Sequence, residues 1–422
     1  MKDLQQFINN SPSSYQATDN ISWKLEENGF EKLDEKKKWE LNSGGSYYIV
    51  RNMSSVIAFR MGKDPDFKSG FLIAGAHTDS PSLKLKSEGF SLKDNLVRVS
   101  TETYGAPIVS SWFDRELSIA GVVNVRKNNK WSRELFNYEK PIAIVPNLAI
   151  HMNKEVNKGF EYNKQNHLQA VFGVSSSIKD PLRYIVSSKF NVEPVDIGEM
   201  DLFLFDPKPS SLLGEEYIIS PRIDNLAMCH SILSSFISAD ISNSIQVAVF
   251  YDNEEIGSLT YQGANSSFLS EILERIILSD NKNTREDFFR AKAASFLISA
   301  DGAHAVHPNF SDKHDPDYAP KLNGGPVIKM NAGFKYATTS ETALVFQNIC
   351  EELSIPCQKF IGRSDIPSGS TIGAISAANL GIRTVDVGNP MLAMHSIRET
   401  YGVKDHYFMN KILTYYFNKG LV

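Results

Sequence analysis

The chain has 422 residues, of which 42% are hydrophobic and 22% are charged, and its formal net charge is −5. This length is typical of two to three domains, and the composition is typical of a globular protein with a large core. The negative charge argues against a nucleic-acid partner, and no apolar run reaches the ~20 residues that a membrane-spanning helix needs.

The first residues and the cysteines favour a cytoplasmic protein. The opening stretch "MKDLQQFINN" carries charges and lacks the apolar segment of a signal peptide. The three cysteines, Cys229, Cys350 and Cys357, include no close-spaced metal or redox pair. Such thiols are typical of a reducing compartment, where they serve as small core residues.

In chain order, the first predicted elements are two helical segments that break at Ser11-Pro12 and end at Gly29. The stretches "SYYIV" and "SSVIAFRMG" predict a hairpin around residues 51–52. The apolar runs "GFLIAG", "SIQVAVFY", "ASFLISA" and "IRTVDVG" predict parallel strands that are buried on both faces. Because "EILERIILS" and "SETALVFQNICEEL" predict covering helices, we expect an α/β domain with a mixed sheet covered by helices.

The pattern changes between about residue 90 and residue 217. This stretch contains many short β-like pieces, such as "NLVRVSTETYG", "LSIAGVVNV" and "KPIAIVPNLAI", and little helical periodicity. We interpret residues 90–217 as an inserted, mostly β second domain. The α/β domain would then be discontinuous and would comprise residues 1–89 and 218–422.

Each of the four buried runs is followed by side chains that bind metals. In open α/β sheets, ligands bind in the crevice outside the carboxyl ends of the strands. Asp224, in "SPRIDNLAMCH" just ahead of an amphipathic helix, adds a fifth segment. We therefore expect one crevice at which five segments meet. The side chains after the four runs are, in order, His77 with Asp79, then Asp252 with Glu254 and Glu255, then Asp301, and then His395.

The crowding of carboxylates in "VFYDNEEIGS" is the feature that favours a metal. Like charges ~4 Å apart repel by ~4 kcal/mol at an effective dielectric constant of 20, so such groups either face water or surround a cation. Imidazoles and carboxylates without thiolates suit Zn, Co or Mn. A carboxylate that bridges two cations needs two imidazoles and two further carboxylates. The complete set would be His77, Asp224, Glu255, Asp301 and His395.

Three acidic residues of these segments remain for other roles. Glu254 would be a general base beside the metals, and Asp79 would orient the ring of His77. Taken singly, each residue has a simpler interpretation: a core histidine, a solvated acidic loop, or an aspartate that caps a helix or turn. The metal hypothesis depends on the coincidence of all five segments. We expect Asp252 to have a structural role.

Short stretches along nearly the whole chain identify a resemblance. They are, in order, "SPSSYQA", "AHTDSPSLKLK", "SWFDRELSIAG", "IHMN", "SPRIDNL", "DNEEIGS", "SADGAHAVHPN", "GPVIKMN" and "GSTIGAI…LAMHSIRE". This ordered set resembles the aspartyl aminopeptidase family, which includes vacuolar aminopeptidase I. The resemblance implies a dizinc exopeptidase-like α/β catalytic domain interrupted by a β domain. It also implies an aminopeptidase that acts on peptides with free N-termini and prefers Asp or Glu there.

The resemblance also implies a role for each metal-site residue. His77, Asp224 and Asp301 would hold one zinc ion, and Asp224, Glu255 and His395 the other, so that Asp224 bridges them. Co²⁺ or Mn²⁺ could replace Zn²⁺. Glu254 would be the base. Related dizinc exopeptidases further imply a cis peptide bond between Asp224 and Asn225.

Four further residues match positions that contact substrate in the family: His151, His304, Lys329 and Tyr336. Of these, His151 belongs to the β domain and matches a histidine that reaches into a neighbouring subunit's site. The family assembles into tetrahedral dodecamers, so the inserted domain would serve oligomerisation and substrate gating. The chain departs from the family at Gly302, where relatives often have methionine, and at Ser368, where some have cysteine.

Several alternatives stay open at this point. The strand-end pattern alone also fits another dizinc amidohydrolase, such as a carboxypeptidase or deacylase. Lys329 could hold the substrate backbone or a structural carboxylate, which would leave an aminopeptidase of neutral or broad specificity. A metal-stabilised scaffold or cargo-binding assembly is a non-enzymatic alternative, although a purely structural site needs no spare Glu254. The stretch "PSGST" is not the G-x-S-x-G turn of a serine hydrolase.

Overall fold

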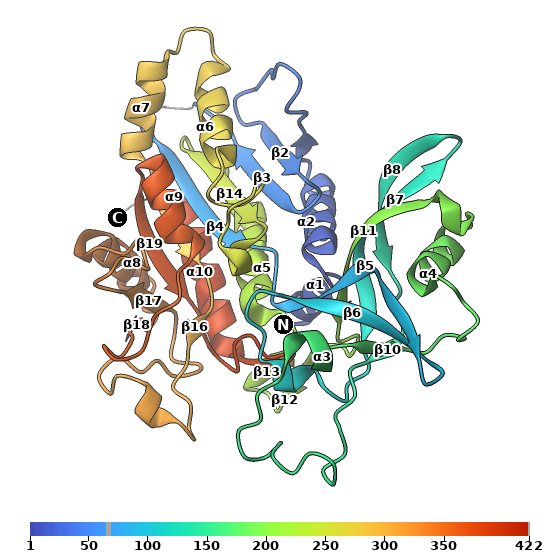
Figure 1. The fold of residues 1–422 in the computed structure, drawn as a ribbon. Coiled ribbons are helices and arrows are strands. Elements are labelled where there is room, and N and C mark those ends of the chain that lie inside the picture. The colour runs from blue at the N-terminus through green and yellow to red at the C-terminus, as the bar shows by residue number, and fades with distance from the viewer. Residues whose placement is uncertain (65–68, 421–422) are drawn as a thin grey trace.

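A nine-stranded mixed sheet with helices on both faces dominates the computed structural model, which describes residues 1–64 and 69–420 (Figure 1). This architecture confirms the predicted α/β class with a mixed sheet covered by helices. In spatial order the strands are β1 (Glu31–Lys32), β2 (Ser46–Arg51), β3 (Ser55–Arg60), β14 (Ile245–Tyr251), β4 (Phe71–His77), β15 (Phe296–Ala300), β19 (Arg383–Gly388), β17 (Val327–Met330) and β18 (Gln358–Ile361).

The four predicted buried runs form the centre of this sheet. Strands β14, β4, β15 and β19 are neighbours and run parallel to one another. Every residue of β4, β14 and β15 is buried, because helices cover both faces. The parallel register sets Tyr251 opposite His77, so the carboxyl ends of the strands lie along one edge of the sheet. The predicted hairpin is also confirmed, since β2 pairs antiparallel with β3.

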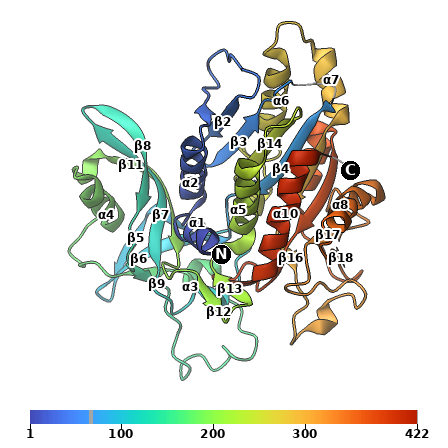
Figure 2. The same ribbon diagram turned by 180° about the vertical axis from the view of Figure 1, so that it is seen from behind.

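Two helical layers bury the two faces of the sheet (Figures 1 and 2). Successive strand residues point to opposite faces, so that Ala248 and Phe250 join one core while Val247 and Val249 join the other. The helices of the first core are α1 (Lys2–Asn9), α2 (Ser14–Glu27), α5 (Ile223–Ser238), α8 (Ser340–Glu352) and α10 (Val403–Lys419). Those of the second core are α6 (Phe268–Leu278), α7 (Arg285–Ala294) and α9 (Ile372–Leu380).

Helix α5, which carries Asp224 in its first turn, is fixed at its far end by a buried arginine. Arg60 donates hydrogen bonds to the carbonyl oxygens of Phe236, Ile237 and Ala239 at 2.6, 3.0 and 2.8 Å. The last carbonyls of a helix have no partner within the helix and carry its negative dipole end. The guanidinium therefore satisfies these groups and anchors α5 to the sheet.

A seven-stranded antiparallel sheet stands beside the larger sheet and has a hydrophobic core of its own (Figure 1). Its strands, in spatial order, are β8 (Lys130–Asn137), β7 (Ser118–Lys127), β11 (Ile197–Phe205), β5 (Ser82–Lys93), β6 (Leu96–Tyr104), β10 (Ala170–Phe172) and β9 (Ala143–Ile144). Two helices accompany it, α3 (Lys164–His167) and α4 (Pro181–Phe190). Because β5 begins at Ser82, the boundary expected at residue 90 falls within this strand.

A third, five-stranded sheet was not foreseen from the sequence. It comprises β12 (Ser211–Leu213), β13 (Tyr217–Ser220), β21 (Glu399–Gly402), β20 (Pro390–Leu392) and β16 (Ala303–His304). Strand β13 leads into Asp224, and His395 lies between β20 and β21, so this sheet positions two of the predicted ligands. In the described residues, no helix has the combined length and apolar character that crossing a bilayer requires.

Candidate metal centre

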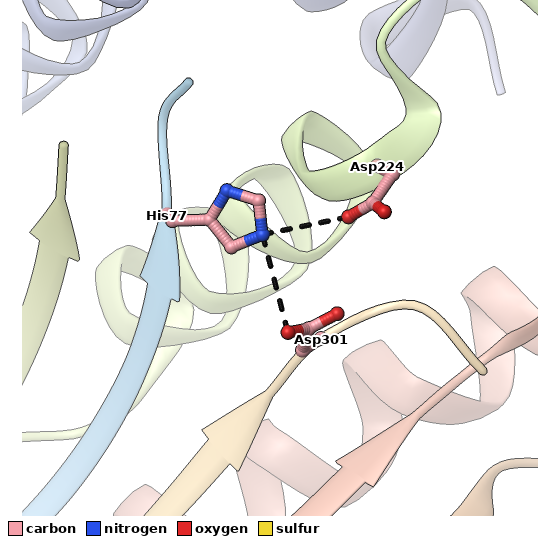
Figure 3. A group of neighbouring side chains, drawn as sticks. All are labelled: His77, Asp224 and Asp301. Carbon is pink, nitrogen blue, oxygen red and sulfur yellow. Dashed lines mark ion pairs between the residues drawn. The ribbon is translucent and has the colours of Figure 1, made fainter. Parts of the chain in front are cut away.

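Three predicted ligands from separate segments meet at the carboxyl edge of the large sheet (Figure 3). His77 ends strand β4, Asp301 follows β15, and Asp224 lies at the start of α5. The Nε2 atom of His77 lies 3.4 Å from Oδ1 of Asp224 and 4.0 Å from Oδ2 of Asp301. All three side chains are buried, so the group is one candidate cation site.

A second group shares Asp224 with the first. The Nε2 atom of His395 lies 3.5 Å from Oδ2 of Asp224 and 3.4 Å from Oε2 of Glu255. The two oxygens of Asp224 therefore face two different imidazole rings. One potential ligand atom of each residue lies within 4.8 Å of the others in each of these groups, and also in a group of His77, Glu254 and Glu255.

Two carboxylate oxygens at the centre accept no hydrogen bond from the residues that the structure describes. They are Oδ1 of Asp224, apart from its ion-pair contact with His77, and Oε1 of Glu255. Buried polar atoms without a partner are costly, so each one calls for an explanation. A divalent cation explains both, because imidazole nitrogens and carboxylate oxygens without thiolates are a donor set that zinc accepts. The residues present therefore fit a metal centre.

The peptide bond between Asp224 and Asn225 is cis. The expectation for this bond is thereby confirmed.

Asp79 organises the side chains around His77. The Nδ1 atom of His77 lies 3.1 Å from the carbonyl oxygen of Asp79 and 3.4 Å from its Oδ1. The same carboxylate accepts hydrogen bonds from the backbone N–H groups of Glu254 and Glu255 at 3.1 and 3.2 Å, and from the hydroxyl of Tyr104 at 2.8 Å. Asp79 thus links the first imidazole to the acidic turn.

A buried glutamate that sequence reasoning missed links the other two segments. Glu399 accepts a hydrogen bond from the backbone N–H of Asp224 at 3.0 Å and another from that of His395 at 2.8 Å. The Nδ1 atom of His395 in turn lies 3.0 Å from the carbonyl oxygen of Ala106. Such contacts fix ring orientation and the tautomer that can bind a metal.

The model of the family described as "Aminopeptidase I zinc metalloprotease (M18)" matches residues 7–417. The chain belongs to the M18 family of zinc metallo-aminopeptidases. The probable M18 family aminopeptidase 2 of Clostridium acetobutylicum is 45% identical over 425 residues, which cover 99% of this chain and 98% of that protein. The match to the M18 family thus extends over almost the full chain. The enzyme is a metallo-aminopeptidase, which is a hydrolase.

Solved structures agree with this assignment. The chain resembles one in the cryo-EM structure of the Ape4 and Nbr1 complex with a TM-score of 0.93 and 35% identity, covering 99% of this chain and 85% of that one. It resembles the yeast mApe1 dodecamer with a TM-score of 0.84 and 26% identity, covering 99% and 95% of the two chains. These similarities cover both the α/β unit built on the nine-stranded sheet and the β-rich unit built on the seven-stranded sheet.

A cavity of about 350 Å³ in this M18 aminopeptidase is lined both by the candidate metal ligands and by three of the four predicted substrate residues. These residues are His304, Lys329 and Tyr336, and the cavity also contains Phe360 and residues 369–371. The buried ammonium of Lys329 donates to the carbonyl oxygen of Gly302 at 3.0 Å and lies 3.5 Å from Oδ1 of Asp301.

The fourth predicted substrate residue lies elsewhere. His151 is exposed in the loop between β9 and α3, and it is not among the residues that line this cavity. Within one chain of the M18 aminopeptidase, His151 therefore does not join the other three. Asp252 is buried and likewise does not line the cavity.

Burial dominates the electrostatics of the metal-free centre. It raises the pKa of Glu254 to about 8 and that of Glu399 to about 8, and it raises the pKa of Glu255 as well. Burial also acts on Asp224, but the contacts with His395 and His77 outweigh it and lower the pKa of that carboxyl. Without a cation, the folded enzyme therefore retains protons that the unfolded chain would release.

Chelation should make the stability of this aminopeptidase depend on pH in a defined direction. A carboxyl whose pKa is higher in the folded state binds more protons there, so the free energy of unfolding falls as pH rises. For Glu254 and Glu399 this range runs from 4.5 to about 8. We expect the melting temperature of chelated enzyme to lie below that of zinc-loaded enzyme. The difference between the two melting temperatures should widen as pH rises through this range.

Differential scanning calorimetry of both forms at several pH values measures this difference. Zinc-loaded enzyme is the control, because the positive charge of a bound cation lowers the pKa of nearby carboxyls and so weakens this dependence on pH. A difference that stays constant or narrows as pH rises would contradict the interpretation.

Proposed function

We propose that the enzyme binds two zinc ions per subunit and removes N-terminal residues from peptides, with a preference for Asp or Glu. The observation that carries the two-ion proposal is Asp224, whose two oxygens face the imidazoles of His77 and His395 at 3.4 and 3.5 Å. One ion would take His77, Asp224 and Asp301, and the other Asp224, Glu255 and His395. The donor set also suits Co²⁺ or Mn²⁺.

The chain's own groups then have distinct tasks in peptide hydrolysis. Bound divalent cations supply charge stabilisation for the carbonyl oxygen and lower the pKa of water. Glu254 lies in the cavity with its Oε2 4.0 Å from Nε2 of His77, close enough to the centre to accept a proton from the attacking water. It returns that proton to the leaving amine. The carboxylates nearby would hold the free α-amino group, which restricts cleavage to N-termini.

We also propose a division of labour along the chain. The segments expected at residues 1–89 and 218–422 would form the catalytic domain, and the segment expected at residues 90–217 an inserted domain for oligomerisation and substrate gating, with the first boundary moved to the start of β5 at Ser82. The inserted domain has an exposed loop on which Leu148, Ile150 and Met152 expose 54%, 47% and 70% of their surface. Since mApe1 forms a dodecamer, we propose a homo-oligomer, and a tetrahedral dodecamer in particular. The cysteines are free, consistent with a cytoplasmic location.

Replacing Glu254 with Gln should separate catalysis from metal binding. The amide keeps the size of the side chain but cannot accept the proton, so we expect kcat to fall by ~10²–10⁴-fold. Bound zinc, measured by atomic absorption, should remain at the wild-type level. The matched variant Glu255→Gln should instead lose zinc from one site. A Glu254→Gln enzyme with near wild-type turnover would show that another group is the base.

Replacing Lys329 with Met should test the acidic preference. Since Lys329 also contacts Asp301, we expect kcat/KM to fall for every substrate. Removal of the ammonium would also leave the carboxylate of an acidic substrate buried without a cation, so the loss should be ~10²-fold greater for Asp and Glu substrates than for Leu. The decisive quantity is the ratio of kcat/KM for Asp-anilide to that for Leu-anilide in each enzyme.

Two results would contradict parts of this proposal. A wild-type enzyme that cleaves Leu-anilide best would remove the acidic preference and leave an aminopeptidase of neutral or broad specificity. A ratio that Lys329→Met leaves unchanged would show that Lys329 does not cause the preference and serves instead to neutralise Asp301.

Co-expression of two inactive variants should test whether His151 acts on a neighbouring subunit. We expect His151→Ala to lower kcat/KM while bound zinc stays unchanged. In a mixed oligomer with Glu254→Gln chains, a site with an intact Glu254 can receive His151 from the other type of chain, so part of the activity should return. Separately purified variants mixed without subunit exchange are the control. If the mixed oligomers were no more active than the two separate variants, His151 would not act in a neighbouring subunit's site.

A further inference from the structure

A second cavity of about 390 Å³ continues from the catalytic cavity. The two cavities share five lining residues: His304, Tyr336, Phe360, Gly369 and Met394. A ligand that reaches the metal groups can therefore extend into the second cavity without leaving the protein surface. Its volume falls in the range of roughly 300–1,000 Å³ that is usual for ligand pockets.

The two cavities differ in the charged side chains that line them. Four carboxylates line the catalytic cavity: Asp224, Glu254, Glu255 and Asp301. Among the described residues that line the second cavity there is no Asp or Glu, whereas the side chains beyond the shared ones include His307, Lys313, His314 and Arg363. The second cavity thus offers basic groups to whatever extends from the metal centre.

Lys313 is the basic group most available to a ligand. Its closest carboxylate is that of Asp312, at 3.7 Å, and the two side chains are 65% and 73% exposed, so this pair is weak. Arg363 has a different task, because it is paired with Asp365 at 2.8 Å and donates to the carbonyl oxygen of Asp312 at 3.0 Å. This contact holds the turn that carries Lys313 against the segment that follows β18.

A histidine in the same lining lacks a partner. Among the described residues, the Nδ1 atom of His314 has no hydrogen-bond partner, and almost none of its surface is exposed. This nitrogen therefore offers no contact to a ligand in the second cavity, and Lys313 remains the group on which binding would depend.

We propose that the second cavity binds the part of the peptide that follows the scissile bond, and that it favours a carboxylate there. This inference rests on the proposed aminopeptidase function. An N-terminal residue ends at the metal centre, whereas the leaving peptide must continue away from it, and the second cavity provides a continuous route. Acidic side chains two residues beyond the N-terminus, or the free C-terminus of a short peptide, are the groups that Lys313 would attract.

The test compares substrates that differ only after the scissile bond. Asp-Ala-Glu, Asp-Ala-Gln and Asp-Ala-Lys, all with amidated C-termini, are hydrolysed by wild-type enzyme, by Lys313→Glu and by Lys321→Glu. Lys321 is exposed in the same connection between β16 and β17 but lines neither cavity, so it controls for net charge. Asp-p-nitroanilide and Leu-p-nitroanilide, which lack a leaving peptide, control for the catalytic centre.

We expect wild-type kcat/KM to be highest for the Glu peptide and lowest for the Lys peptide. Each change of one charge should alter kcat/KM by up to about fivefold at low salt, the upper range for an exposed pair. Lys313→Glu should reverse this order for the peptides and leave the ratio of kcat/KM for the two anilides unchanged, and Lys321→Glu should behave as wild type. Asp-Ala-Gln with a free C-terminus should be cleaved faster than its amide.

Three results would overturn the inference while leaving the proposed function intact. They are equal wild-type kcat/KM for the three peptides, an equal effect of Lys321→Glu, and a change in the Asp-to-Leu anilide ratio in Lys313→Glu. The last result would assign the cavity to the N-terminal side chain. If zinc-loaded wild-type enzyme cleaves no anilide and no peptide, the proposed function itself fails.

Discussion

One carboxylate between two imidazole rings, that of Asp224, is the constraint around which the centre is built. Its backbone N–H and that of His395 both donate to the buried Glu399, so the two ligands cannot shift independently. Arg60 holds the other end of α5 through three carbonyl groups. These contacts hold Asp224 in place, which would limit the rearrangement that the binding of a cation requires. Oε1 of the nearby Glu255 has no hydrogen-bond partner among the described residues.

The β-rich unit contributes directly to this centre. At the end of β6, Tyr104 donates to Asp79 and the carbonyl oxygen of Ala106 lies 3.0 Å from Nδ1 of His395. Gly105, between them, has a φ of +68°, and a Cβ there would lie 3.1 Å from the Cβ of Glu255. A side chain at residue 105 would therefore combine backbone strain with crowding of Glu255. Because these groups contact Asp79 and His395 of the α/β unit, displacement of the β-rich unit would disturb the candidate metal centre.

The sequence predicted what depends on hydrophobic runs and on side-chain chemistry. The four central strands and the convergence of His77 and Asp301 at their ends follow from those signals. The roles of Glu399 and Ala106 could not be predicted from the sequence. A buried glutamate cannot be told from a surface glutamate in the sequence, and a backbone carbonyl group leaves no sequence signal. The five-stranded sheet has strands of two to four residues. Such strands are too short to show the alternation of apolar and polar residues by which a strand is predicted. Helix α5, expected to be amphipathic, is buried almost all round because α1 and α10 pack on it.

The charge balance of the catalytic cavity offers a reason for an acidic preference that does not require Lys329 to contact the substrate side chain. Its ammonium lies against Asp301 and the carbonyl oxygen of Gly302, so its hydrogen-bonding capacity is partly used. Two divalent cations would balance the four carboxylates that line the cavity, and the ammonium of Lys329 would then leave one positive charge in excess. In a confined, poorly screened cavity such an excess favours a carboxylate on the bound N-terminal residue and disfavours a second ammonium. On this argument, the proposed preference for N-terminal Asp or Glu would depend on the charge of the centre as a whole.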